Sequence, residues 1–324
     1  MDSFTLLKYI ENSKYILSEG AVIERLRRDS SLELDPHLVN SAFIYDSKKR
    51  EALESIYRQY MDIGRNFDLP LLLSTPTWRA SRLRIREAGY EDRDVNGDNF
   101  KFLDSLRKSY GKYSDKILIC GLMSCKGDAY VPEESLSVDD AYDFHTWQAA
   151  RLADAGVDFN LAATLPALSE ARGIAFALAA TVKPYIVSFI VRPQGTLLDG
   201  TPLKIAVSEI DNSVHPKPLA YMINCTHASF AQAALMHKTN SSSIVRQRMI
   251  GLFANTAAMS PEDLNNNTNL VEEDPEEFGR SVAELGRNPG LKILGGCCGT
   301  DDRHIRALAS RLASMNGRIL PLSK

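Results

Sequence analysis

Two adjacent cysteines flanked by glycines stand near the carboxyl end of the chain, in a pattern suited to metal binding. The stretch reads Gly295-Gly296-Cys297-Cys298-Gly299 and follows an apolar run. Neighbouring cysteines do not readily bridge each other, because closing that ring strains the disulfide geometry. Glycines on both sides permit the sharp turn that brings two thiols to the same side of the backbone. We therefore predict that Cys297 and Cys298 supply two ligands to one metal ion.

A third thiol is available at Cys225, which ends the apolar run at 220–224. Three thiolates favour zinc over calcium or magnesium, because soft sulfur donors select the borderline-soft ion. A structural zinc site uses four protein ligands, whereas three ligands leave one position open for water or substrate. A substrate thiol in that position would be deprotonated and become a nucleophile. The pattern predicts a catalytic zinc site whose thiol substrate attacks an activated methyl group.

Short apolar, β-rich runs alternate with longer helical patterns along the 324 residues. The expected strands are 15–17, 70–74, 116–120, 157–161, 184–189, 220–224, 249–255 and 291–294. The expected helices include 42–67, 138–155, 169–181, 230–237 and 302–315. Eight strands, most of them followed by a helix, predict a (β/α)8 TIM barrel. A doubly wound sheet is the alternative, but the nucleotide-binding glycine motifs of such folds are missing.

The chain is expected to form a single barrel domain over residues 1–324, because no linker rich in glycine or serine and no internal repeat interrupts it. We interpret 265–277 as a polar surface loop. Three further loops, 96–113, 126–137 and 212–217, carry no recognisable signature for a methyl donor.

Composition limits the classes of partner. The net charge of −3 is spread over both signs, so nucleic acid is not an expected partner. No window of 18 apolar residues predicts a membrane span, and the amino-terminal stretch lacks the apolar core of a signal peptide. Five cysteines in a chain of this kind indicate reduced thiols in the cytoplasm. The oligomeric state is not predicted.

In a TIM barrel the chemistry lies at the carboxyl ends of the strands. This rule brings Cys225 and the Cys297–Cys298 pair to the same rim, two strands apart. It also selects four substrate-contact candidates: Glu19, Thr75, Thr164 and Asn255. Cys120 is expected to be a core thiol and Cys125 a loop thiol. We expect His304 to have a capping or packing role, and Asp301 or Asp302 to cap the last helix.

The same motifs resemble those of the homocysteine S-methyltransferase family. The resemblance is carried by Gly295-Gly296-Cys297-Cys298-Gly299-Thr300 and by Ile223-Asn224-Cys225-Thr226, with support from Thr75-Pro76-Thr77-Trp78-Arg79-Ala80. It extends from about residue 15 to residue 312 and implies a barrel with Zn2+ held by the three cysteines. The family moves a methyl group to the thiol of homocysteine, giving methionine. Because the chain ends soon after the last expected helix, we expect no appended folate or cobalamin module and favour a sulfonium donor, S-methylmethionine or S-adenosylmethionine.

Two positions depart from the family pattern. The first strand usually ends in Asp-Gly, where this chain has Glu19-Gly20, and the fourth usually ends in Glu-Thr, where it has Ala163-Thr164. In the family these carboxylates help to hold the amino group of homocysteine. The departures leave two alternatives open: a family member with another acceptor (a thiol or selenol) or donor, and a zinc-binding barrel without catalytic activity.

Overall fold

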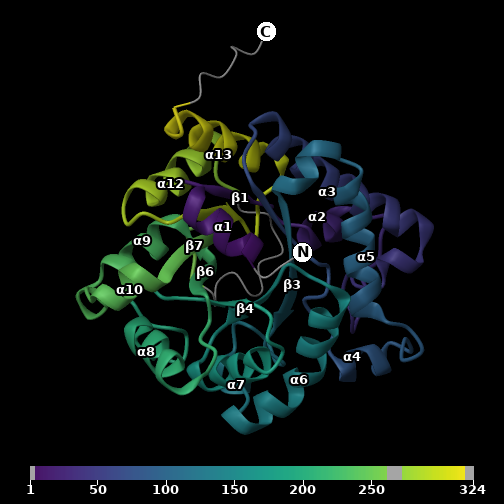
Figure 1. Ribbon diagram of the computed structural model, residues 1–324, viewed down its shortest axis with the longest axis horizontal. Coiled ribbons are helices and arrows are strands. Elements are labelled where there is room, and N and C mark those ends of the chain that lie inside the picture. The colour runs from purple at the N-terminus through teal and green to yellow at the C-terminus, as the bar shows by residue number, and fades with distance from the viewer. Residues whose placement is uncertain (1–3, 261–271, 318–324) are drawn as a thin grey trace.

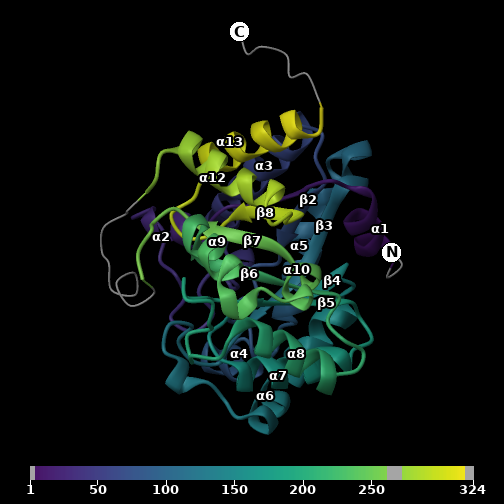
Figure 2. The same ribbon diagram turned by 90° about the vertical axis from the view of Figure 1, so that its left-hand side faces the viewer.

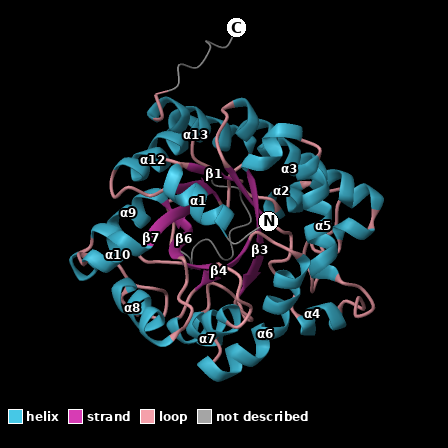
Figure 3. Ribbon diagram, viewed as in Figure 1, coloured by secondary structure: helices cyan, strands magenta, loops and turns pink. Residues whose placement is uncertain are grey.

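A closed barrel of eight parallel strands forms the centre of the computed structural model, which describes residues 4–260 and 272–317. Each strand pairs with the next along the chain, and β1 pairs with β8 (Figure 3). The strands are β1 (Ile16–Ser18), β2 (Leu71–Ser74), β3 (Ile117–Ser124), β4 (Phe159–Leu165), β5 (Tyr185–Phe189), β6 (Ala220–His227), β7 (Met249–Asn255) and β8 (Ile293–Gly296). The prediction of a TIM barrel is confirmed.

Helices surround the strands as an outer ring (Figure 1). The α-helices are α1 (Phe4–Asn12), α2 (Ile23–Arg28), α3 (Ser47–Asn66), α4 (Arg82–Glu87), α5 (Val95–Lys108), α6 (Val138–Ala155), α7 (Leu168–Ala179), α8 (Leu203–Ser213), α9 (Ala228–Met236), α10 (Ser243–Arg248), α12 (Pro275–Arg287) and α13 (Asp302–Met315). Short 3-10 helices lie at Phe43–Tyr45, Gly111–Lys116, Pro132–Glu134 and Lys238–Asn240. The ring buries the outer faces of the strands against apolar helix faces.

Two expected loops are partly helical, so these predictions were wrong. Most of 96–113 belongs to α5, which begins after the Asp94 cap and buries Phe100, Leu103 and Leu106 at helical spacing. The predicted loop 265–277 lies partly outside the described residues, but its last three residues open α12. Asp274 caps this helix and Pro275 takes its first position, a combination typical of helix starts.

Strands β3, β4 and β6 each extend three or four residues further toward the rim than the apolar runs indicated. As a result Thr164 lies inside β4 and Cys225 inside β6, each with a left-handed backbone (φ of 59° and 50°). Strand pairing is irregular at both places, between Ala162 and Leu165 and between Asn224 and Thr226. Such irregularities bend a strand and redirect a side chain, and they are common beside functional sites.

The first helix closes the barrel at the end opposite the rim. Leu6 of α1 is 1% exposed and packs with the inward-facing residues Ile16, Leu72, Leu118, Phe159, Ile186, Met222 and Ile293. In Figure 1 α1 lies across the centre of the barrel, and in Figure 2, turned by 90°, α1 and α2 lie at opposite ends. The amino-terminal end of the barrel is therefore covered, while chemistry is left to the carboxyl rim.

None of the helices in the described part of the chain combines the length and apolar character that crossing a membrane would require.

Candidate metal centre

Three thiols from two parts of the rim meet in one cluster. The Sγ atoms of Cys225, Cys297 and Cys298 all lie within 4.8 Å of one another, and those of Cys225 and Cys297 are 2.7 Å apart. Among the described residues this is the one group of three or more histidine, cysteine, aspartate or glutamate side chains with such spacing. The three cysteines that the sequence predicted to share one rim of the barrel thus lie together in the structure.

The irregularity in β6 aims Cys225 at the other two thiols. Asn224 pairs with Phe253 of β7 and Thr226 pairs with Ala254, so Cys225 is the extra residue in between. The side chain of Asn224 holds the neighbouring strands in place, because its Oδ1 accepts from the Thr164 amide at 3.0 Å and from the Ser188 hydroxyl at 2.7 Å.

A glycine-rich turn aims the other two thiols. The amide of Cys297 donates to the Ala254 carbonyl at 2.7 Å, and the amide of Cys298 donates to Oδ1 of Asn255 at 3.1 Å. Gly299 has a φ of 83°, and a Cβ there would lie 1.9 Å from Oγ1 of Thr256. The turn therefore needs glycine at this position both for its backbone conformation and for space.

The three thiols differ in pKa when no metal ion is bound. Hydrogen bonding from Cys225 lowers the pKa of Cys297 well below its usual range, and the same contact raises the pKa of Cys225. A hydrogen bond from Cys225 also lowers the pKa of Cys298, but hydrogen bonding with Cys297 and burial outweigh it and leave that pKa at about 12. Cys297 is therefore the most acidic of the three. A divalent cation would favour the thiolate form of all of them.

Glu19 places a carboxyl group in the barrel interior at the end of β1. The residue is 8% exposed, and its Oε1 accepts from the Ser74 amide at 3.1 Å. Its Oε2 is buried without a hydrogen-bond partner among the described residues. Burial raises the pKa of Glu19 to about 8, although the hydrogen bonds with Ser74 oppose this shift. A buried carboxyl with one free oxygen is suited to receive a donor or a cation.

Glu24, which was not selected from the sequence, contacts the cysteine turn. Its Oε2 accepts from the Gly299 amide at 2.5 Å and is 3.3 Å from a guanidinium nitrogen of Arg28. Burial raises the pKa of Glu24 to about 7, with a further contribution from the charge of Cys298. Glu24 follows the end of β1 and lies in the first turn of α2. The rule that chemistry lies at the carboxyl ends of the strands could have pointed to this position.

Tyr130 is a second residue that the sequence analysis missed. Burial, together with the charges of the three cysteines and an interaction with Cys225, raises the pKa of its phenol. Tyr130 belongs to the loop after β3, for which no periodicity predicts a structure.

Buried charges hold that loop in place. Glu170 accepts from the amides of Lys126 at 2.7 Å and Leu136 at 3.2 Å, close to the two ends of the loop, and pairs with His145 at 2.9 Å. Arg79 donates to the carbonyls of residues 125, 126 and 127 at 2.7–3.1 Å. The loop beside the thiols is thus anchored by both a buried anion and a cation.

The remaining substrate-contact candidates have structural partners. Thr75 is fully buried, and its hydroxyl bonds with Thr77 at 2.7 Å and accepts from the Leu122 amide at 3.0 Å. The hydroxyl of Thr164 accepts from the Trp78 indole at 2.9 Å and contacts Ser124. Asn255 supports the cysteine turn through Oδ1, while its Nδ2 is buried without a partner among the described residues.

Two histidines and the two remaining cysteines lie outside the cluster. His304 forms a capping box with Asp301 at the start of α13, as expected. His227 caps α9 through Ser229. Cys120 lies in the barrel interior, and Cys125 contacts the Thr164 carbonyl at 3.6 Å, so both are buried away from the metal cluster.

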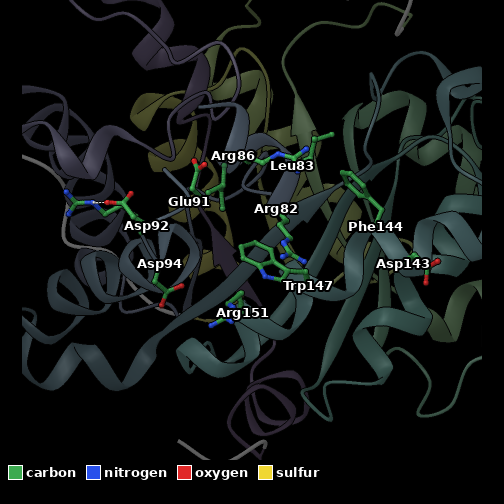
Figure 4. Close-up of a pocket in the computed structure, with 12 residues that line it drawn as sticks. Arg82, Leu83, Arg86, Glu91, Asp92, Asp94, Asp143, Phe144, Trp147 and Arg151 are labelled. Atoms are coloured by element: carbon green, nitrogen blue, oxygen red, sulfur yellow. Dashed lines mark ion pairs between the residues drawn. The ribbon is translucent and has the colours of Figure 1, made fainter. Parts of the chain in front are cut away.

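A separate groove of about 930 Å3 lies on the outer helices, between α4 and α6 (Figure 4). Its lining includes Arg82, Arg86, Trp147 and Arg151, and it includes neither the three cysteines nor Glu19. The groove is therefore distinct from the chemistry at the rim.

Fold and site together define a class of protein: a TIM barrel with a cluster of three thiols at the carboxyl rim that could hold a metal ion. The donor set fits zinc, because three sulfurs of suitable spacing converge and one tetrahedral position is left without a cysteine. A family model described as Homocysteine S-methyltransferase matches residues 16–312. The chain belongs to this family.

Relatives agree with this assignment. The chain is 28% identical over 198 residues to homocysteine S-methyltransferase of Escherichia coli K12, an alignment covering 59% of this chain and 59% of that protein. It thus spans less than two thirds of that relative. It is 27% identical over 294 residues to homocysteine S-methyltransferase 2 of Arabidopsis thaliana, covering 81% and 83% of the two chains.

A solved structure supports the fold. The metallated form of the homocysteine methyltransferase MmuM from Escherichia coli matches with a TM-score of 0.73 at 20% identity, covering 96% of this chain and 100% of that one.

Proposed function

We propose that the protein is a zinc-dependent S-methyltransferase that moves a methyl group from S-methylmethionine or S-adenosylmethionine to the thiol of homocysteine, giving methionine. The observation that carries the proposal is the convergence of Cys225, Cys297 and Cys298 within 4.8 Å, in a chain that belongs to the homocysteine S-methyltransferase family. A small-molecule thiol and a methyl donor are the partners that this reaction requires.

The three cysteines would hold the zinc ion, and the position without a cysteine would receive the acceptor sulfur. The metal supplies Lewis acidity, which lowers the pKa of the acceptor thiol and favours its nucleophilic form near neutral pH. The rigid turn at Gly299 and the irregularity at Cys225 keep the three sulfurs in place before either substrate arrives. This preorganisation limits the movement needed during the reaction.

The acceptor would be oriented by groups that have unused hydrogen-bonding capacity. Glu19 offers its free Oε2 to the ammonium group of homocysteine, and Asn255 offers its free Nδ2 to the carboxylate. Thr75 and Thr164 would line the pocket chiefly by holding its walls, since their hydroxyls already have protein partners. In the transfer, the acceptor sulfur forms a bond to the methyl carbon while the donor carbon–sulfur bond breaks. The donor sulfur keeps that electron pair and becomes a neutral thioether.

Ala163 favours a second candidate, a related methyltransferase with another thiol or selenol as acceptor. Its side chain places a methyl group, rather than a carboxylate, at the end of β4, and the residue is 4% exposed. Losing a charged partner for the ammonium group would weaken homocysteine binding by roughly tenfold to a hundredfold.

The test is methionine formation by the zinc-loaded protein from homocysteine with each sulfonium donor. We expect product with at least one donor, and loss of both product and bound zinc in Cys297→Ser. Absence of product with both donors, at one equivalent of bound zinc, would exclude methylation of homocysteine by these sulfonium donors. A sharp rise in homocysteine turnover in Ala163→Glu would favour the second candidate.

A further inference from the structure

Glu24 places a carboxylate against the cysteine turn. Its Oε2 accepts from the amide of Gly299, the residue after Cys298, at 2.5 Å. Its carboxylate is nonetheless not one of the metal-ligand candidates, because the cluster with donor atoms within 4.8 Å of one another consists of the three thiols. The Glu24 side chain is 27% exposed, so it lies beside the metal centre and still faces solvent.

The charges at this place call for a cation. With three thiolates, an ionised Glu24 brings the local charge to −4, and a divalent metal ion neutralises half of it. In the described part of the chain the ion pair of Glu24 is with Arg28, whose own side chain is 37% exposed, and an exposed pair of this kind is weak. The carboxylate is therefore available to a second cation that approaches from solvent.

The two carboxylates of the site differ in depth. Glu19 is buried in the barrel interior with a free oxygen, so it is suited to the substrate that binds first and deepest. Glu24 is partly exposed beside the cysteine turn, so a second substrate that enters from solvent can reach it. We propose that Glu24 is a specificity residue for the methyl donor, and that it selects donors whose methyl group is attached to a positively charged atom. This inference rests on the proposed function and adds the residue that recognises the positive charge of the donor.

The donor loses its positive charge during the reaction, so the proposed role of Glu24 has a distinct kinetic effect. A sulfonium donor is cationic when it binds, but its positive charge disappears as the carbon–sulfur bond breaks and its electron pair returns to sulfur. The Glu24 carboxylate therefore stabilises the bound donor more than the transition state. Removing the negative charge is expected to raise the KM for the donor without lowering kcat, which differs from the loss of kcat that a distorted site produces.

Glu24→Gln is the decisive variant, because the amide oxygen still accepts from the Gly299 amide while the charge is gone. With S-methylmethionine as the donor, we expect KM to rise roughly tenfold and kcat to stay equal or rise. The inhibition constant of methionine, which has the same ammonium and carboxylate groups but a neutral sulfur, should change less than twofold. The affinity for homocysteine should also be unchanged, as measured by the thiolate absorption of the cobalt-substituted protein.

Two further variants bracket this result. Glu24→Asp keeps the charge but withdraws it by one methylene group, so the KM should rise by less than in Glu24→Gln. Arg28→Gln frees Glu24 from its ion pair, so the KM for S-methylmethionine should fall. An unchanged KM in Glu24→Gln, an equal weakening of methionine and S-methylmethionine, or a loss of homocysteine affinity would each overturn the proposal.

Failure of the proposed function would look different. In that case the wild-type protein forms no methionine, and calorimetric titration of zinc-loaded wild type and Glu24→Gln with S-methylmethionine replaces the kinetic test. Tenfold weaker binding in the variant would still support the role of Glu24, and equal or undetectable binding in both would refute it.

Discussion

Glu19→Gln is expected to change how the stability of the protein depends on pH. Burial raises the pKa of the Glu19 carboxyl from 4.5 to about 8 in the folded protein. The folded state therefore keeps a proton between these pH values that the unfolded chain has already released. Over this range the wild-type protein should lose about 1.4 kcal/mol of stability per pH unit from this residue alone. The sum over the whole window is about 3–5 kcal/mol.

Glutamine has nearly the same shape and does not titrate, so its contribution should not vary with pH. The new Nε2 donor of glutamine, placed where Oε2 has no partner, adds a constant cost of about 1–3 kcal/mol. The informative quantity is therefore the difference in unfolding free energy between variant and wild type as a function of pH. This difference should shift in favour of the variant from pH 5 to pH 8 and then become constant.

Urea denaturation of both proteins at pH 5, 6, 7, 8 and 9, with chelator and reductant present, measures this difference. Working without metal avoids the pH dependence of zinc binding, and the titration of Glu24 and the thiols is common to both proteins. Parallel stability curves would refute the reasoning, because they would mean that Glu19 has an ordinary pKa in the folded state.

Three other perturbations test the remaining parts of the site. Gly299→Ala should reduce zinc affinity at least tenfold and lower the free energy of unfolding by more than about 2 kcal/mol. The control Gly200→Ala, at a similar φ of 85° but with open space around it, should cost about 1 kcal/mol. Equal costs of the two variants in urea denaturation would contradict the clash with Thr256. Glu170→Ala removes the partner of the buried His145 ring and of two backbone amides of the loop, and it should cost about 3–5 kcal/mol in urea denaturation. A cost below about 1 kcal/mol would show that the loop is not held by this residue. The oxidant diamide should oxidise two of the five thiols of the metal-free protein, by forming a disulfide between Cys225 and Cys297, whose Sγ atoms are 2.7 Å apart. Bound zinc should slow the formation of this disulfide. Peptide mapping that finds a disulfide without Cys225 would contradict the geometry.

The pattern of the sequence was sufficient for the barrel and for the convergence of three cysteines. Eight apolar runs that alternate with helical patterns determine which strand ends share a rim, and the glycines around Cys297 and Cys298 indicate a turn. The roles of individual side chains at the rim were harder to predict from the sequence. The side chain of Thr75 is used internally, and Cys225 reaches the cluster only because β6 contains an extra residue.

Glu24 and Tyr130 could not be found from periodicity, because their positions depend on turns and on a loop that distant residues hold. The loop of Tyr130 is anchored by Glu170, which is 40 residues further along the chain. The amide that Glu24 binds, that of Gly299, is 275 residues away in sequence. Contacts over such separations follow from the completed barrel and not from any local pattern.

The helix α1, whose Leu6 fills the amino-terminal end of the barrel, has a consequence for the order of events. Because the amino-terminal end of the barrel is closed, both substrates and both products must enter and leave through the carboxyl rim. A deeply seated acceptor cannot enter past a donor that already occupies the rim. The kinetics should therefore be sequential and ordered, with the thiol entering first and the methylated product leaving last.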